Sequence, residues 1–340
     1  WVGNAAIITA VVRYLTIFFP ALGTNGLLAF IVSSSILWLF TLINLKGVKE
    51  AGFVGIVTTV AKISVLIVVI AVAFWGFSFD NFYTVSAAEL SGFGSIPVAV
   101  AITLWSYIGL ESASVTGGEI KNPARNIKLS TILGFSITAV IYILTSFAAM
   151  GAMPQSELAN STAPMSDIIN RISGGTWGGW FMALGVIVAA GGATSGWILT
   201  TARSSFAAGE EKLFPSFFAR VHKRYSTPSV SLIVSGVLAN VLLSLNYVLS
   251  LTDAFNFMIL LATLAFLPAY SFSAAAQILL TNTEEKSWRK LLKASIIPLL
   301  AFIYCVYTTY AAGAEVAMYT FILMLLGIPV FVVMRLQNRR

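Results

Sequence analysis

Three groups that could act together on one ligand stand within residues 105–111: an indole at Trp105, a glycine at Gly109 and a carboxylate at Glu111. A desolvated cation is attracted to the face of an indole ring, and a carboxylate adds a Coulombic attraction. A glycine between them permits backbone conformations that end a helix. This pattern favours a binding site for a positively charged ligand.

The same residues interrupt a run, 95–118, that otherwise has the length of one membrane helix, and the pair Gly117 and Gly118 follows them. An unpaired backbone group in hydrocarbon is costly, so a turn at that depth persists only where it lines a polar cavity or is buried in protein. Many secondary transporters build their substrate site from a broken helix with an ionisable residue near the bilayer midplane. We therefore expect a helix that ends near Ile108 and a carrier with its site at this break. The alternative for Glu111 is a carboxylate that only accepts backbone N–H bonds at the break.

Two further residues are candidates because of their depth in apolar runs. Lys62 is the only charged residue in the run 53–76. A lysine there cannot easily reach the membrane surface, so it must face a cavity or a partner. Trp197 follows a segment of small residues, 189–196, which would let a helix or a ligand approach the backbone closely. A packed core aromatic is the alternative for Trp105 and for Trp197.

The composition identifies the protein class that must position these residues. Hydrophobic residues make up 58% of the chain and charged residues 10%, whereas about a quarter of residues are charged in soluble domains. We therefore predict an all-α polytopic membrane protein, and 340 residues accommodate about ten spans of roughly 20 residues with short loops. The predicted spans are 1–19, 26–45, 53–76, 95–118, 129–151, 178–207, 229–250, 254–281, 293–312 and 315–335.

Lys and Arg fall in alternate loops between these spans. Because short cytoplasmic loops carry the Lys and Arg excess, the basic loops and the C-terminus are expected in the cytoplasm, and the loop 152–175 outside. Charge that is spread over loops in this way also argues against nucleic-acid binding. The basic residues are Lys46, Lys49, Lys121, Arg125, Lys128, Lys212, Arg220, Lys223, Arg224, Lys286, Arg289, Lys290, Lys293, Arg335, Arg339 and Arg340.

Other functional classes lack the residues they need. A channel requires a ring of like polar groups along a pore, and an enzyme requires a nucleophile with its base or a metal cluster. The single cysteine, Cys305, lies in an apolar run, and the single histidine, His222, lies in a basic loop. We therefore expect no enzyme activity, no cofactor and no metal.

Several stretches of the chain carry a family resemblance. On them, the chain resembles the amino acid, polyamine and organocation transporters, and within these the basic amino acid/polyamine antiporters. The stretches are GNAA at 3–6, LWSYIGLESASV with KNPARN at 104–126, SGWILTTARSSFAAGEEKLFPSFFARV at 195–221 and GAEVAMYTFILM at 313–324.

The resemblance implies the inverted-repeat transporter fold of the leucine-transporter type, with five-plus-five repeated helices and two more. The ten predicted spans correspond to the third to twelfth helices, so we expect the first two to be absent from this sequence. Residues 1–340 then form one transmembrane domain. Within it, 1–76 is the remainder of the first repeat, 95–281 is the second repeat, and 293–335 holds the two additional helices.

The resemblance also implies roles for single residues. Trp105 corresponds to a gating aromatic whose ring lies against the cationic end of the substrate, and Ile108 packs against the aliphatic stem. Trp197 forms an apolar wall, and Asn4 offers a polar contact. Ile7, on the same helix, stands where the family can have a methionine and joins this substrate-binding set.

Three positions are implied at the break and at the coupling site. Gly109 contributes free backbone groups to the substrate site. Glu111 is implicated in binding the substrate or in proton coupling. Lys62 corresponds to a lysine that places its ammonium where sodium-coupled members bind an ion.

The implied function is the exchange of a cationic amino acid for its decarboxylated amine, of the arginine-for-agmatine type, by alternating access. The alternative is a broader amino acid permease driven by protons or by exchange. The expected ligands are cationic amino acids and polyamines, the expected location is the bacterial inner membrane, and a homodimer is possible within this family.

Overall fold

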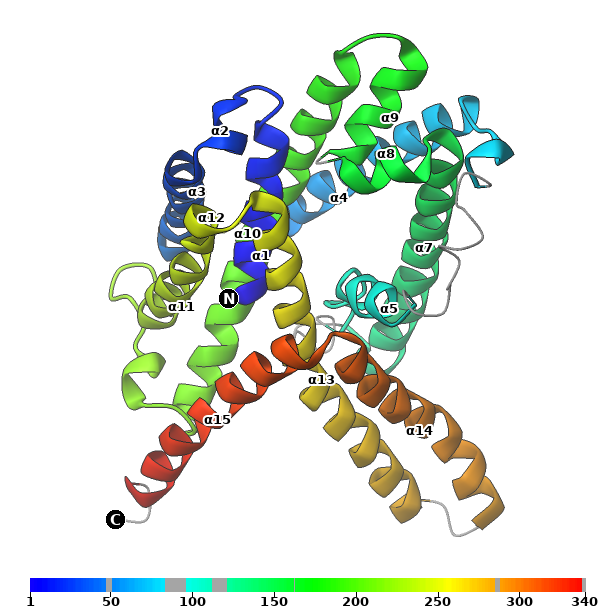
Figure 1. Cartoon of the computed structure of the whole chain (residues 1–340). Helices are drawn as coiled ribbons and strands as arrows, with labels where there is room; N and C mark the ends of the chain where they lie inside the picture. The colour runs from blue at the N-terminus through cyan, green and yellow to red at the C-terminus, as the bar shows by residue number, and fades with distance from the viewer. Residues whose placement is uncertain (47–50, 83–95, 112–120, 162, 285–287, 338–340) are drawn as a thin grey trace. The chain divides into compact units, whose positions relative to one another are not determined.

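Figure 1 shows the computed structural model of the chain, which describes residues 1–46, 51–82, 96–111, 121–161, 163–284 and 288–337. All regular secondary structure in these ranges is helical. Some residues named above lie outside the described residues, and these are Lys49, Gly117, Gly118, Lys286, Arg339 and Arg340.

The described helices follow one another along the chain. They are α1 (Val2–Leu15), α2 (Ala21–Thr24), α3 (Gly26–Lys46), α4 (Ala51–Trp75), η1 (Phe79–Phe82), α5 (Ile96–Trp105), α7 (Pro123–Ala152), α8 (Gln155–Asn160), α9 (Pro164–Ser173), α10 (Trp177–Glu210), η3 (Ser216–Ala219), α11 (Ser229–Leu243), α12 (Leu245–Val248), α13 (Leu251–Glu284), α14 (Trp288–Ala311) and α15 (Ala314–Gln337).

Eight described stretches of helix are long and apolar enough to cross a membrane. Two further apolar helices, α1 and α5, are shorter, and each of the ten predicted spans overlaps one of these ten segments. The prediction of an all-α polytopic membrane protein is therefore confirmed.

Two predicted spans begin too late in the sequence, because basic residues extend the helices beyond the apolar runs. Helix α7 begins at Pro123 rather than near residue 129, and α14 begins at Trp288 rather than near residue 293. Proline is favoured at the first helical position, since its φ suits the helix and its missing N–H needs no partner. Lysine and arginine are good helix formers, so Arg125 and Lys128 continue α7 instead of forming a loop.

The described residues form two compact units. The first comprises residues within 1–87, 136–258 and 328–340, and the second comprises residues within 88–135 and 259–327. These units are defined by compactness, whereas the predicted repeats are defined by common ancestry. The division of the sequence into two repeats therefore stays a prediction.

Helix α10 is central to the first unit, where α1, α3, α4, α9 and α11 pack against it. Glycines on α10 allow the closest of these contacts. A β-carbon at Gly192 would lie 2.6 Å from the side chain of Thr58 on α4. A β-carbon at Gly185 would lie 2.9 Å from the side chain of Val65, also on α4. Small residues allow membrane helices to approach in this way, and they fix the part of α4 that carries Lys62.

A buried polar contact holds α1 in the first unit. Asn246 of α12 donates from Nδ2 to Thr9 Oγ1 on α1 and to Ser33 Oγ on α3, each at 3.4 Å. All three side chains are buried. This contact links the helix that carries Asn4 and Ile7 to its neighbours.

In the second unit, α14 packs against α5. This unit also contains the first residues of α7, most of α13 and the first half of α15. It therefore holds the predicted helix break together with α13.

Candidate functional site

The predicted break is present, and it begins earlier than expected. Helix α5 ends at Trp105, and the backbone then turns over residues 106–111. The end of the helix is tightened by bonds from Tyr107 N to Leu104 O at 2.9 Å and from Ile108 N to Trp105 O at 3.2 Å. Such i to i+3 bonds are common where a helix terminates. The predicted helix end at Ile108 is corrected to Trp105.

Gly109 supplies the conformation that the turn requires. Its φ of 108° is a region that residues with a β-carbon rarely adopt. The turn after α5 therefore has a non-helical backbone at this glycine. The break depends on the local sequence, because a residue with a side chain would be strained here.

Glu111 reaches back to the break. Its Oε2 accepts the backbone N–H of Gly109 at 2.9 Å. The phenol of Tyr270, on α13, interacts electrostatically with the same side chain. The backbone N–H of Gly109 therefore orients the carboxylate at the break. This backbone contact is the one that the alternative interpretation of Glu111 requires.

Tyr270 was missed by the sequence analysis. Hydropathy places it inside a long apolar helix, two residues after Pro268. A phenol in such a helix needs a partner for its hydroxyl, and that need was the available signal. The sequence pattern does not say which segment provides the partner.

Trp105 and Ile108, the aromatic and aliphatic residues predicted to contact the substrate at the break, are three residues apart in the chain. Trp105 and Ile108 are both half-buried, and the bond between their backbones keeps them within one turn. Tyr107 points elsewhere, since its ring packs against Phe135 with the centroids 5.6 Å apart. The second unit thus brings together Trp105, Ile108, Gly109 and Glu111.

The other predicted residues belong to the first unit. Asn4 on α1 is 4% exposed, and its Oδ1 has no hydrogen-bond partner among the described residues. A buried amide oxygen without a partner is unfavourable by about 1–3 kcal/mol, so it is suited to a polar ligand or a water molecule. Ile7, one turn further along α1, is half-buried.

Trp197 lies on α10, just after the small-residue segment. Part of that segment is in contact with a neighbouring helix, since a β-carbon at Gly191 would lie 3.3 Å from the Phe40 ring on α3. A β-carbon at Gly196 would have nothing within 4 Å. The helix face beside Trp197 is therefore open at Gly196, and the indole itself is half-buried.

Lys62 lies on the face of α4 that packs against α10. It stands between Thr58, which contacts Gly192, and Val65, which contacts Gly185. The side chain is half-buried, and no described residue forms an ion pair or hydrogen bond with its ammonium. A cation placed between two such tight helix contacts is held at a fixed depth.

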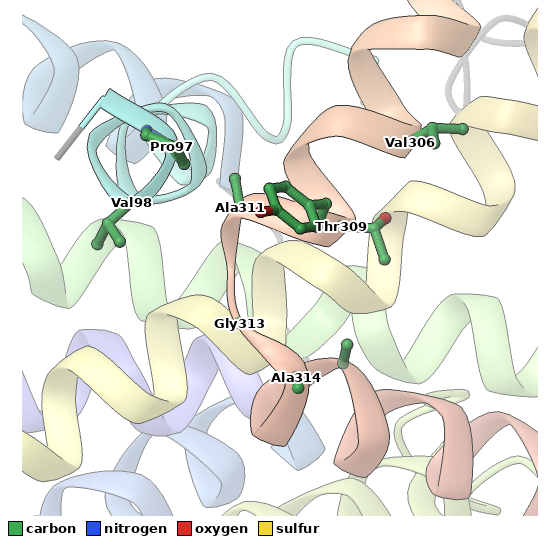
Figure 2. Close-up of a pocket in the computed structure, with 9 residues that line it drawn as sticks. Pro97, Val98, Val306, Thr309, Ala311, Gly313 and Ala314 are labelled. Carbon is green, nitrogen blue, oxygen red and sulfur yellow. The ribbon is translucent and has the colours of Figure 1, made fainter. Parts of the chain in front are cut away.

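A cavity of about 750 Å³ lies in the second unit, near the turn between α14 and α15. Figure 2 shows Pro97 and Val98 of α5 on one side of it, with Thr309 and Ala311 of α14 and Ala314 of α15 around it. The Thr309 hydroxyl donates to Cys305 O at 2.8 Å and is already satisfied. None of the predicted site residues is among its described lining residues. Its apolar walls do not suit a cationic amino acid.

Comparison with known proteins identifies the family of the chain. A sequence model described as amino acid permease matches residues 1–334. The arginine/agmatine antiporters of Chlamydia abortus and Chlamydia pneumoniae are 30% and 31% identical to the chain, each over 97% of this chain and 70% of the relative. The arginine/ornithine antiporter of Pseudomonas aeruginosa is 30% identical over 93% of this chain and 68% of the relative. Because the match covers nearly every residue, the chain belongs to the amino acid permease family and is a multi-pass membrane protein.

Proposed function

We propose that the protein is an antiporter that exchanges a cationic amino acid for its decarboxylated amine, with arginine and agmatine as the first pair to test. The observation that carries this proposal is the identity of about 30% to arginine/agmatine antiporters over 97% of the chain. The specific pair rests on those relatives. The preference for a cation also has support in the geometry of the second unit.

Three features at the end of α5 favour a positive charge. The last carbonyl groups of a helix carry partial negative charge, and broken transporter helices use such ends to hold cations. Trp105, whose indole is half-buried, is the last residue of this helix. The Glu111 carboxylate accepts the backbone N–H of Gly109 in the turn that follows. In a water-poor site, the carboxylate supplies the Coulombic attraction and the indole supplies cation–π attraction.

Glu111 is oriented for this role before a substrate arrives. The Gly109 N–H holds its carboxylate, so less freedom is lost when a cation binds. Carboxylate oxygens accept N–H bonds from guanidinium and ammonium groups. We assign Trp105 the role of covering the bound cation and closing access from one side, with Ile108 against the aliphatic stem.

In the first unit, we assign substrate contacts to Asn4, Ile7 and Trp197 on the strength of the family. The unpartnered Oδ1 of Asn4 supports a contact with a donor on the substrate. The open helix face at Gly196 supports a wall formed by Trp197. Lys62 takes the place of a coupling sodium ion in this proposal.

A second candidate is exchange with ornithine as the counter-substrate. The Pseudomonas aeruginosa relative, named as an arginine/ornithine antiporter, is 30% identical and so is about as similar as the arginine/agmatine antiporters. Ornithine keeps the α-carboxylate that agmatine lacks. The two candidates therefore differ in the charge moved in each exchange cycle.

Exchange in proteoliposomes tests the proposal. Vesicles preloaded with agmatine, ornithine, lysine, cadaverine or putrescine are exposed to labelled arginine, and empty vesicles are the control. Arginine uptake that requires internal agmatine, and that responds to a membrane potential because the two molecules differ in charge, supports the first candidate. Uptake driven by ornithine and not by agmatine supports the second. Uptake into empty vesicles at the same rate excludes obligatory exchange.

We further propose that the basic loops and the C-terminus face the cytoplasm of a bacterial cell. In a Cys305→Ser background, a single cysteine is placed at Ser156 in α8, on the side expected outside, or at Ser216 in η3, on the side expected in the cytoplasm. Both positions are exposed. An impermeant thiol reagent on intact cells should label the first and not the second. The reverse pattern excludes this orientation. The homodimer stays a prediction of the family resemblance, to be tested by the molar mass in detergent.

A further inference from the structure

The connection between α10 and α11, residues 211–228, is folded against the ends of membrane helices rather than extended into solvent. Gly209 at the end of α10 lets the connection approach, since a β-carbon there would lie 2.8 Å from Ala219 N and 3.0 Å from Phe218. Ser231 Oγ on α11 donates to Phe218 O at 3.1 Å. Thr227 Oγ1 donates to Leu45 O, near the end of α3, at 2.8 Å. The middle and the last residues of the connection are therefore tied to helix ends.

The second half of the connection is a closed turn. His222 N donates to Thr227 O at 2.8 Å, and Ser226 N donates to His222 O at 2.9 Å. The His222 ring stacks on the Tyr225 ring with the centroids 4.8 Å apart. The Arg224 guanidinium lies 5.5 Å from the centroid of the Tyr225 ring. The basic residues around this turn are consequently presented from a defined backbone.

Large apolar side chains are exposed on the first half of the connection. Leu213 is 42% exposed, Phe214 37%, Phe217 40% and Val221 52%. The Phe214 and Phe217 rings both contact Phe218, with centroids 5.2 Å and 4.7 Å apart. Phe218 thus supports the two rings, which keep an exposed part.

Basic side chains are interspersed with these apolar ones. Four are exposed, namely Lys212, Arg220, Lys223 and Arg224. Lys46, also exposed, follows Leu45, to which Thr227 is bonded. Two exposed acids, Glu210 and Glu211, stand at the end of α10, so the balance of the connection remains basic.

We infer that residues 211–228 bind anionic phospholipid headgroups of the leaflet on their side of the membrane, through Arg220, Lys223 and Arg224, with Phe214 and Phe217 inserted at the acyl boundary. Both flanking helices are membrane spans, and the ties to their ends keep the connection at the level of the membrane surface. Basic and aromatic side chains together at that level are the pattern of a surface-bound segment. Charge complementarity selects anionic lipids over zwitterionic ones.

The headgroup contact is tested with the purified full chain in mild detergent, by titrating phosphatidylglycerol or phosphatidylcholine and counting bound lipids by native mass spectrometry. The triple variant R220Q/K223Q/R224Q should bind phosphatidylglycerol about 100-fold more weakly, as expected for three basic residues near an anionic surface. Its binding of phosphatidylcholine should not change. The matched control, R289Q/K290Q/K293Q, removes the same charge from the start of α14 and should retain phosphatidylglycerol binding.

Two results overturn the headgroup assignment. One is wild-type binding of phosphatidylglycerol by the first triple variant, and the other is an equal loss in both triple variants, which would mean that net charge alone matters. Size-exclusion chromatography identifies variants that fail to fold.

Insertion of the rings is tested independently by a nitroxide label at F217C in a C305S background, with E211C as the control position. In vesicles containing phosphatidylglycerol, the label at 217 should collide more with oxygen than with a water-soluble nickel complex, and the label at 211 should show the opposite. Equal exposure of both labels to the nickel complex overturns the insertion.

Discussion

Glu111 Oε2 accepts the backbone N–H of Gly109 at 2.9 Å, two residues earlier in the chain. The same residue pair therefore breaks the helix and fixes a carboxylate at the break. The glycine provides the backbone conformation, with φ at 108°, and the carboxylate satisfies the N–H that the break exposes. The binding role proposed for Glu111 and the local fold are consequently coupled at this position.

Substitutions at Glu111 separate these two roles. Glu111→Gln keeps an oxygen that can accept the Gly109 N–H, but it removes the charge. We expect near-normal thermal stability and at least about tenfold weaker arginine binding, since bonds between charged groups are worth about 1.5–3 kcal/mol. Glu111→Ala should also lower stability by about 1–3 kcal/mol, because the N–H loses its acceptor. Calorimetric binding and thermal unfolding in detergent measure the two effects. Undiminished arginine binding by the glutamine variant would leave Glu111 with the structural role alone.

Tyr270→Phe removes the phenol hydroxyl that interacts with Glu111 while keeping the ring. If the phenol acts through the carboxylate, its loss should weaken arginine binding about threefold to tenfold, as expected for one hydrogen bond. In the Glu111→Gln background the same change should have little effect, so the two substitutions should not be additive. A double-mutant cycle on arginine affinity makes this measurement. Full additivity would show that Tyr270 acts independently of Glu111.

The contact between α4 and α10 should depend on the absence of a side chain at Gly192. Gly192→Ala places a methyl group 2.6 Å from Thr58, and overpacking of this kind typically costs about 1–3 kcal/mol. The matched control is Gly196→Ala on the same helix, where nothing lies within 4 Å. We expect a lower unfolding temperature for the first variant only, with partial recovery in Gly192→Ala/Thr58→Ala. Equal unfolding temperatures for the two single variants would mean that α4 shifts freely.

Exchange should not require sodium if the Lys62 ammonium occupies the position of a coupling ion. A fixed cation there repels a second one and bridges helices. Arginine exchange should therefore have the same rate in sodium and in choline media. Lys62→Met, which keeps the aliphatic length without the charge, is the matched variant and should lose exchange in both media. Strict sodium dependence of the wild type contradicts this role.

Hydropathy was sufficient to predict an apolar helix in each of ten spans, because the bilayer imposes length and composition. Gly109 was sufficient to predict the break. The helix end was misplaced by three residues, since its last turn is tightened by i to i+3 bonds that hydropathy does not encode. The start of α7 was misplaced because Pro123 and basic residues continue a helix outside hydrocarbon. Tyr270 was missed because its contact with Glu111 joins segments far apart in the chain.

The central claim is that Trp105 and Glu111 recognise a cation, and affinity measurements on Trp105 variants test it most directly. Trp105→Leu keeps apolar bulk without a π face, and Trp105→Tyr keeps a face. A cation–π contribution of about 2 kcal/mol corresponds to roughly 30-fold in affinity. Arginine and agmatine should therefore bind in the order Trp, Tyr, Leu, with about that span. Citrulline, the neutral isostere of arginine, should bind weakly to all three proteins and discriminate little among them. Arginine binding to a folded leucine variant with wild-type affinity would contradict the account and make Trp105 a packing residue.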